Sequence, residues 1–204
     1  MLAALGFALN GLAALIFALY VFPLARLSGR LAPLSARIGA VATRINETVA
    51  SGVKWFALGL VLIEAAVVLL RYVFSISFLW MQDAIIYLHG ALFLLAAGYA
   101  LHVGAHVRVD VFRRAMSDRR KALVDFIGVY VLLAPVAAAI LIAAGPWVAQ
   151  SWAVQEGSAE GAGLGLVYVL KSFIPAFAVL VALQGLALAD RSAAALRRER
   201  EAAA

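Results

Sequence analysis

Ionisable residues lie within the apolar stretches of this sequence or at their ends: Glu64, Arg71, Asp83 and Lys171. Such side chains are costly in hydrocarbon, so they are usually paired or used in transport. Glu64 lies deepest, about 16 Å from the nearer end of its stretch at about 1.5 Å per residue. It can relay protons or ions, or it can face another helix or a partner subunit. Lys171 can reach Glu64, extend outward or meet a partner, and the sequence leaves these alternatives open.

Arg71 and Asp83 flank a short turn between two apolar stretches. Each lies six residues from Ser77, the midpoint of the turn. In an antiparallel hairpin their side chains therefore reach a similar depth. A cross-hairpin ion pair would offset the cost of desolvating both charges. The alternative is that each side chain extends separately to water.

The three histidines make a weak case for a haem or metal site. His89 and His102 share one apolar stretch, and their thirteen-residue separation rotates an α-helix by about 220°, which puts them on different faces. No other apolar stretch carries a histidine to complete a haem-ligating pair. His102 and His106 share a face, but no carboxylate lies at their level. The absence of cysteine excludes disulfides, cysteine-bound zinc and iron–sulfur clusters.

Hydrophobic residues make up 66% of the 204-residue chain and charged residues 14%, which excludes a soluble globular protein. A helix needs about 20 apolar residues to cross the hydrocarbon layer. Five stretches meet this requirement: Met1–Leu24, Val53–Phe74, Leu79–Val103, Ala122–Ala149 and Leu164–Ala189. We therefore predict an all-α polytopic membrane helix bundle, with four core transmembrane helices and an extra N-terminal one. Little of the chain remains for a catalytic domain, so we expect no enzyme and no catalytic residues.

Basic residues occupy alternate gaps between these stretches. Five lie between 26 and 54, six between 106 and 121, and four after 190, while the gaps 75–79 and 150–163 hold none. Because basic residues stay on the cytoplasmic side of a bacterial inner membrane, the C-terminus is predicted inside and the N-terminus outside. Anionic phospholipid headgroups match this charge, and we expect no nucleic-acid partner.

The predicted organisation has four parts. Residues 1–27 form the extra membrane helix. A signal peptide carries basic residues before its apolar stretch, and none precedes this one. A re-entrant or surface-lying segment is the alternative. Residues 28–52 form an amphipathic cytoplasmic surface helix or a linker helix, since apolar residues recur at helical spacing between basic ones. Residues 53–190 form a four-helix membrane domain, in which Pro135 and Pro175 should kink their helices. Residues 191–204 form a basic cytoplasmic tail.

Several short motifs follow one another along the chain: Arg71-Tyr72-Val73-Phe74, Trp80-Met81-Gln82-Asp83, Tyr87-Leu88, Gly104-Ala105-His106-Val107-Arg108-Val109-Asp110, Ser151-Trp152 and Lys171-Ser172-Phe173-Ile174-Pro175. In this order and spacing they resemble the small membrane subunit of tripartite ATP-independent periplasmic (TRAP) transporters, over roughly Ile45 to Ala189. The extra N-terminal segment departs from the usual four-helix subunit. Whether it packs on a large partner, on the scaffold or in lipid stays open.

The resemblance implies a scaffold subunit of a sodium-coupled importer of organic anions, often carboxylates. A large elevator-type membrane subunit would carry the sodium and substrate sites, a periplasmic protein would capture the substrate, and this chain would hold no cofactor or metal. It also implies that Arg71, Trp80 and Asp83, near the outer end, help to hold the complex or contact the periplasmic protein. His106, Arg108 and Asp110 would then order the inner end of the third stretch. Lys171 is a further candidate for a structural or partner contact.

Two alternatives remain beside this interpretation. The chain could be a self-contained small carrier or channel that uses Glu64, Asp83 and Lys171. It could also be a haem-binding membrane anchor through His89 and His102. The absence of an internal repeat argues against a complete transporter, because many transporters alternate their access through duplicated halves.

Overall fold

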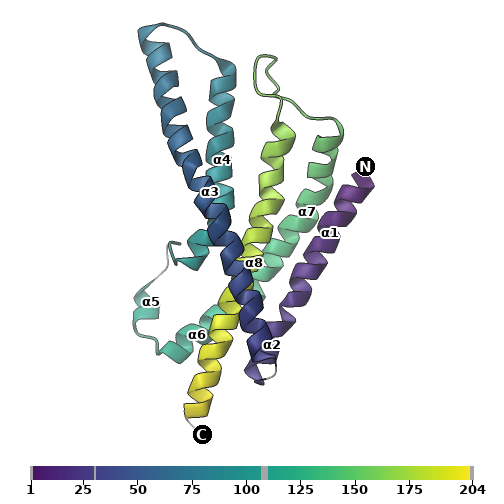
Figure 1. Cartoon of the computed structure of the whole chain (residues 1–204), viewed down its shortest axis with the longest axis vertical. Helices are drawn as coiled ribbons and strands as arrows, with labels where there is room; N and C mark the ends of the chain where they lie inside the picture. Colours follow the sequence, from purple (N-terminus) through teal and green to yellow (C-terminus); the bar gives the residue numbers. More distant parts are fainter. Residues whose placement is uncertain (1, 30, 107–109, 203–204) are drawn as a thin grey trace.

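The computed structural model describes residues 2–29, 31–106 and 110–202, and every regular element in these ranges is helical (Figure 1). The elements, in chain order, are α1 Leu2–Leu19, α2 Val21–Leu27, α3 Ala32–Val73, α4 Leu79–His102, α5 Asp110–Arg114, α6 Asp118–Gly128, the π-helical η1 Val129–Leu133, α7 Ala134–Ala153 and α8 Val167–Ala202. Five segments of this described part are long and apolar enough to cross a membrane. The predicted all-α polytopic class is confirmed.

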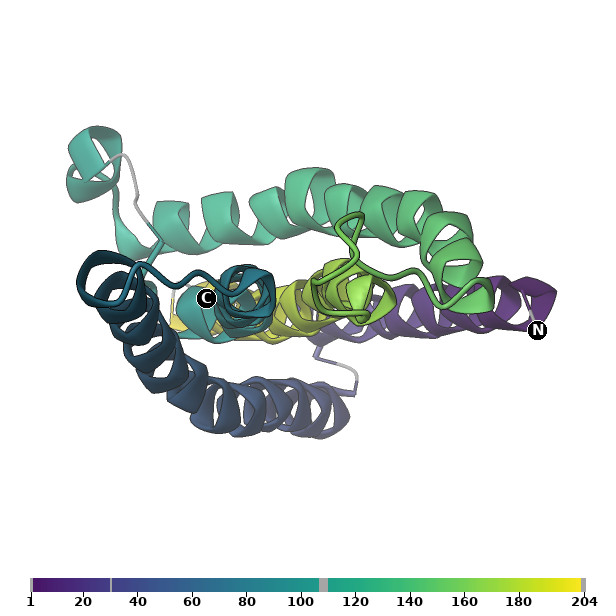
Figure 2. The same ribbon diagram turned by 90° about the horizontal axis from the view of Figure 1, so that it is seen from above.

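Helix α8 is the centre of the bundle. It contacts α1, α2, α3, α4, α6 and α7, and α3 and α7 lie on opposite sides of it (Figure 2). Small side chains recur along α8 at helical spacing and are fully covered: Ala178, Ala182, Gly185, Ala189 and Ala193. Small residues let helix backbones approach closely, which is the main source of helix association in lipid.

Helix α3 joins two regions that the sequence predicts as separate elements. The structure shows one continuous helix here, because α3 runs from Ala32 to Val73 across the boundary between residues 28–52 and the second apolar stretch. Its 42 residues extend about 63 Å at about 1.5 Å per residue. No proline follows Pro33 at its start, and each isolated glycine costs only about 1 kcal/mol of helix stability. Nothing in the segment therefore forces the helix to end.

The buried face of α3 carries mostly small or polar side chains: Ser35, Gly39, Ala42, Asn46 and Val53. Several of the larger apolar residues that recur at helical spacing in this region are exposed: Leu34, Val41 and Ile45. The reason is close packing, since an alanine Cβ at position 39 would already lie 3.5 Å from the Ala187 Cα of α8.

Two further boundaries differ from the sequence prediction. The expected disturbance at Pro135 takes the form of the π-helical turn η1, which lies directly before it. Such a turn accommodates the backbone carbonyl that receives no hydrogen bond because proline has no N–H. As a result, Asp118–Ala153 is one continuous helical segment. Residues 191–202, predicted as part of a separate tail, continue α8.

The extra N-terminal segment packs on the chain's own helices. It breaks at Tyr20 into α1, which runs along α7, and α2, which contacts α8 and α3 (Figure 1). Ala13, Ile16 and Tyr20 are buried in the core that α1 shares with α7 and α8. At the break, Tyr20 Oη donates to the Ala182 carbonyl at 2.6 Å, and Tyr130 Oη donates to the Tyr20 carbonyl at 2.6 Å. Of the three surfaces that the sequence left open, the structure shows contact with the chain's own helices.

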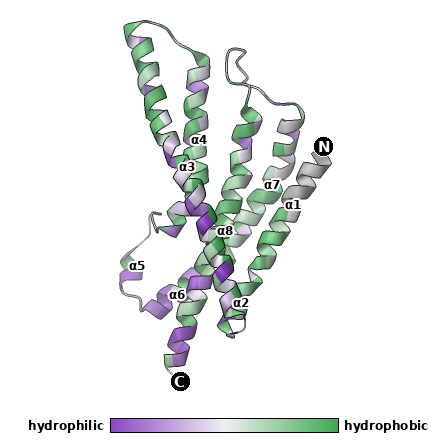
Figure 3. Cartoon of the chain, in the orientation of Figure 1, coloured by the Kyte–Doolittle hydropathy of each residue, from purple (hydrophilic) through white to green (hydrophobic). Residues whose placement is uncertain are grey.

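The two ends of the bundle differ in polarity. One end, called the basic end here, holds α2, α5, α6 and the end of α8, and hydrophilic residues gather there (Figure 3). The other, called the hairpin end, holds the α3–α4 turn at residues 74–78 and the α7–α8 connection at 154–166. The start of α1 lies toward the hairpin end, and the C-terminus lies at the basic end (Figure 1).

Gly98 is the point where α4 approaches both α3 and α8, and it yields a stability prediction. A Cβ at this position would overlap Asn46 Oδ1 and come 2.9 Å from the Leu180 carbonyl oxygen. We expect Gly98→Ala to destabilise the chain by about 1–3 kcal/mol through overpacking. Thermal unfolding in detergent measures this effect. Gly128→Ala is the matched control, because nothing lies within 4 Å of its added Cβ, and alanine is the better helix former. Equal unfolding midpoints for the two variants would contradict this packing analysis.

Candidate functional site

A buried ion pair ties the N-terminal segment to the central helix near the basic end. Asp190 of α8 accepts hydrogen bonds from Arg26 of α2 and from Ser35 of α3. The side chains of Arg26 and Asp190 are only 17% and 8% exposed. We call these three residues the N-terminal clamp. Losing one partner of a buried pair leaves an uncompensated charge and costs about 3–5 kcal/mol, so the clamp fixes α2 on α8.

His102 lies in a second polar network, between α3, α4 and α8. Its Nδ1 atom lies 3.4 Å from Gln184 Nε2 and 3.2 Å from Arg191 Nη1. Both of these atoms are donors, so Nδ1 must accept, and the ring proton then lies on Nε2. Nε2 is 3.5 Å from Glu47 Oε1. The histidine therefore connects three helices, which is a structural use of its ring.

Asp83 does not pair with Arg71, and the predicted cross-hairpin ion pair is absent from the structure. Asp83 Oδ2 instead accepts the backbone N–H of Leu164 at 2.7 Å, which fastens the α7–α8 connection to α4. A Cβ on Gly163 would overlap Asp83 Oδ2 and Ser158 Oγ, so only glycine fits there. Arg71 is exposed at the end of α3. The Asp83 carboxylate therefore bonds to a backbone N–H of the α7–α8 connection, a donor outside the α3–α4 hairpin.

Lys171 extends toward the hairpin end rather than toward Glu64. It forms an ion pair with Glu156 of the α7–α8 connection, and its Nζ lies 4.3 Å from the centroid of the Trp147 ring. At the next residue of α8, Ser172 Oγ accepts a hydrogen bond from Trp152 Nε1 of α7 at 2.8 Å. The hydrogen bond from Lys171 lowers the pKa of Glu156. Lys171 thus joins α8, α7 and the connection between them.

Glu64 and His89 lie on the outer surface of the α3–α4 hairpin. Both are exposed, and both line a hollow of about 620 Å³ between the two helices. Glu64, expected to be buried, is therefore uncovered within this chain. Neither residue makes a hydrogen bond or an ion pair with another described residue, although the His89 ring stacks on Phe93.

The remaining predicted contact residues lie at the two ends. Trp80 is exposed at the start of α4, near the hairpin end. His106 is exposed just after α4, with Nε2 3.4 Å from the Ala97 carbonyl oxygen. Asp110 is the first residue of α5, and Arg108 lies outside the described residues. Their roles in partner contacts stay predictions.

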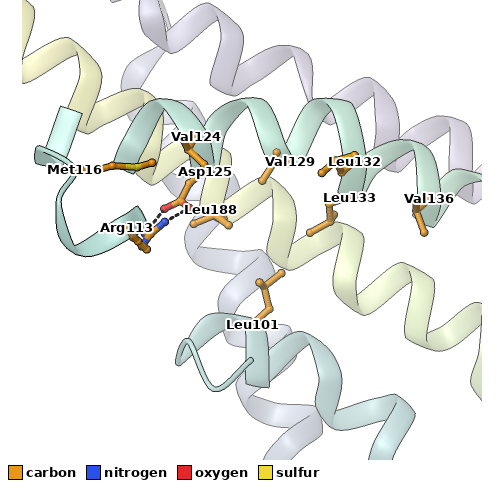
Figure 4. A pocket seen from close by; sticks show the side chains of 11 residues that line it. Leu101, Arg113, Met116, Val124, Asp125, Val129, Leu132, Leu133, Val136 and Leu188 are labelled. Carbon is orange, nitrogen blue, oxygen red and sulfur yellow. Dashed lines mark hydrogen bonds and ion pairs between the residues drawn. The ribbon is translucent and has the colours of Figure 1, made fainter. Parts of the chain in front are cut away.

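A further hollow of about 680 Å³ opens between α4, α6, η1 and α8 (Figure 4). Its lining is mainly aliphatic, with Leu101, Leu132, Leu133 and Leu188 among the side chains that face it. At one edge Arg113 makes a bidentate ion pair with Asp125, with both N–O distances at 2.8 Å. No group of three or more histidine, aspartate or glutamate residues in the described part of the chain could hold a metal ion.

Sequence reasoning missed the N-terminal clamp and the contacts of Gln184. A signal was present for Gln184, because it is an isolated polar residue in a long apolar stretch. Such a residue normally bonds to a neighbouring helix. Asp190 lies just beyond that stretch, beside Arg191. Its partners Arg26 and Ser35 lie more than 150 residues away in sequence, and only the fold brings them together.

The fold and these sites together define a polytopic helical membrane protein in which several polar side chains connect one helix to another. Residues 60–194, about two thirds of the chain, match the family described as tripartite ATP-independent periplasmic transporters, DctQ component. The chain belongs to this family, which is the small membrane component of TRAP transporters, and the resemblance predicted from its motifs is confirmed. Comparisons with curated proteins and with solved structures found no match.

The clamp can be tested through Asp190. We expect Asp190→Ala to leave Arg26 unpaired in a largely covered site and to cost about 3 kcal/mol or more. Hydrogen exchange in residues 10–27 should then accelerate. Asp118→Ala is the matched control, because its side chain is 91% exposed and such changes stay within about 0.5 kcal/mol. Unchanged protection of residues 10–27 in Asp190→Ala would show that the clamp does not hold α2.

The Glu156–Lys171 contact predicts a pH effect on the α7–α8 connection. Because the pKa of Glu156 is lowered from its ordinary value of 4.5, the contact is fully stabilising above pH 4.5. Its contribution is lost as the pH falls through the lower folded-state pKa. Amide exchange in residues 154–166, corrected for its intrinsic pH dependence, should show this loss in the native chain. Glu156→Gln should lack the transition, whereas Glu160→Gln should retain it; an identical pH profile in all three proteins would refute the assignment.

Proposed function

We propose that this chain is the small scaffold subunit of a sodium-coupled importer of organic anions, most often carboxylates. The observation that carries the proposal is the family match over residues 60–194. A large elevator-type membrane subunit carries the substrate and sodium sites, and a periplasmic protein delivers the substrate. This chain holds neither a cofactor nor a metal of its own. Its task is to widen and brace the static part of the large subunit.

The bonding of the polar residues supports a bracing role. Asp190, His102, Asp83 and Lys171 each bond to another helix or to a connection between helices. They are therefore used to hold this chain in one arrangement. A self-contained carrier that uses Glu64, Asp83 and Lys171 would need all three free to meet a substrate or an ion, and these contacts occupy Asp83 and Lys171.

The orientation of the chain follows from its charge. We place the basic end in the cytoplasm, because Lys and Arg residues are retained there, and the hairpin end in the periplasm. This puts the N-terminus outside and the C-terminus inside the bacterial inner membrane. The arginines at the basic end meet anionic phospholipid headgroups.

The exposed residues at each end supply partner contacts in this proposal. Arg71 and Trp80 lie on the periplasmic side, where they help to hold the complex or contact the substrate-binding protein. Asp83 acts there indirectly, because it fastens the α7–α8 connection to α4. His106, Arg108 and Asp110 order the cytoplasmic end of α4.

Reconstitution of the separate components tests the proposed function. Vesicles that contain this chain, its large membrane subunit and the substrate-binding protein should accumulate a carboxylate when a sodium gradient is imposed. Vesicles with this chain alone should accumulate nothing, and omission of this chain should abolish uptake by the other two components. Solute accumulation by this chain alone would contradict the proposal, and so would full uptake in its absence.

A further inference from the structure

The α3–α4 hairpin carries the least covered apolar surface among the five candidate membrane spans. Only 6% of the most apolar window of α3 and 11% of that of α4 are buried, compared with 50% for α8. Large apolar side chains point outward along it, including Val61 at 64% exposure and Phe93 at 69%. On the other side of the bundle, α1 packs against α7. We call Val61, Glu64, Val68, His89 and Phe93 the hairpin face.

Two polar side chains lie at the same depth on the hairpin face. Glu64 lies nine residues before the end of α3, which is about 14 Å. His89 lies ten residues after the start of α4, which is about 15 Å. Because α3 and α4 are antiparallel, both residues lie near the middle of a hydrocarbon layer about 30 Å thick. They also line the same hollow of about 620 Å³.

Lipid is an unfavourable neighbour for this pair. Neither Glu64 nor His89 makes a hydrogen bond or an ion pair within the described part of this chain, and both are exposed. Long lysine and arginine side chains can extend to the interface from such depths, but a glutamate side chain is too short to do so. Ionisable groups within membrane spans almost always face a protein interior or a water-filled cavity. A protein surface that covers the hollow would supply their hydrogen-bonding partners.

We propose that the hairpin face binds a transmembrane helix of the large membrane subunit, and that this helix places a hydrogen-bond donor against Glu64. The donor is a cationic or polar side chain that enters the hollow between α3 and α4. Family membership favours this occupant, because the chain belongs to a family of components of tripartite transporters. A second copy, whose His89 could also donate to Glu64, is the competing outcome that the crosslinking test separates. The proposal rests on the proposed function, since it assigns the surface through which this subunit braces its partner.

Site-specific photo-crosslinking tests the assignment of the hairpin face. A benzophenone side chain replaces Val61 or Phe93 in the complex with the large subunit. It also replaces Leu15 of α1 or Ile142 of α7 as controls, because both of these side chains are 62% exposed. Crosslinks to the large subunit, identified by mass spectrometry, are expected from positions 61 and 93 and not from 15 and 142. Crosslinks from the control positions alone, or hairpin crosslinks only to a second copy of this chain, would overturn the proposal.

Substitution of Glu64 tests the polar contact itself. Glu64→Leu should weaken the association with the large subunit about tenfold in a detergent titration, the equivalent of one lost hydrogen bond to a charged group. Glu64→Gln should retain most of the affinity, because its amide oxygen accepts the same hydrogen bond. The unfolding midpoint of isolated Glu64→Leu should equal or exceed that of the native chain, which separates a lost contact from misfolding. Equal affinity of the leucine variant and the native chain would overturn the role of Glu64.

The two proposals fail in different ways. If the native chain does not bind the large subunit at all, the proposed function fails, and the inference falls with it. If the large subunit binds but crosslinks only to α1 or α7, the proposed function stands and the hairpin face is the wrong surface.

Discussion

Close packing against α8 is the constraint on which the rest of the structure depends. In lipid there is no hydrophobic force between helices, so association relies on van der Waals contact and interhelical hydrogen bonds. Small residues at 178, 182, 185, 189 and 193 open α8 to its neighbours on several sides. The neighbouring helices also carry small residues at these contacts, such as Gly39 and Ala42 on α3 and Gly98 on α4. Polar side chains then fix the register of each contact.

The N-terminal segment shows how an addition is joined to such a bundle. It precedes the region that matches the family, which begins at residue 60. It is held by apolar contacts along α7, by the tyrosine hydrogen bonds at its break and by the ion pair between Arg26 and Asp190. Because α1 covers part of α7 and α8, it leaves the α3–α4 hairpin as the side with most uncovered apolar surface.

The sequence predicted the helical class, the five apolar segments and the family, because these depend on composition, hydropathy and short motifs. It did not predict that α3 is continuous, since an amphipathic pattern alone does not show where a helix ends. It also did not predict which face of α3 contacts α8. Leu34 and Val41 are exposed, whereas the smaller Ser35 and Gly39 pack inward. The pairing of Asp83 was missed for a similar reason, because its donor is a backbone N–H in a connection whose path the sequence does not reveal.

A subunit held together in this way is suited to remain still while a partner moves. The absence of cysteine allows two spin labels to be placed without background from this chain, at Ile76 in the α3–α4 turn and at Glu160 in the α7–α8 connection. The decisive measurement is the distance distribution between these labels in the full transporter, recorded by pulsed electron resonance with and without sodium and substrate. A fixed brace predicts one unchanged distribution in all conditions. A shift of several ångströms when sodium or substrate is added would show that the two connections of this chain move relative to each other during transport, and would contradict the account.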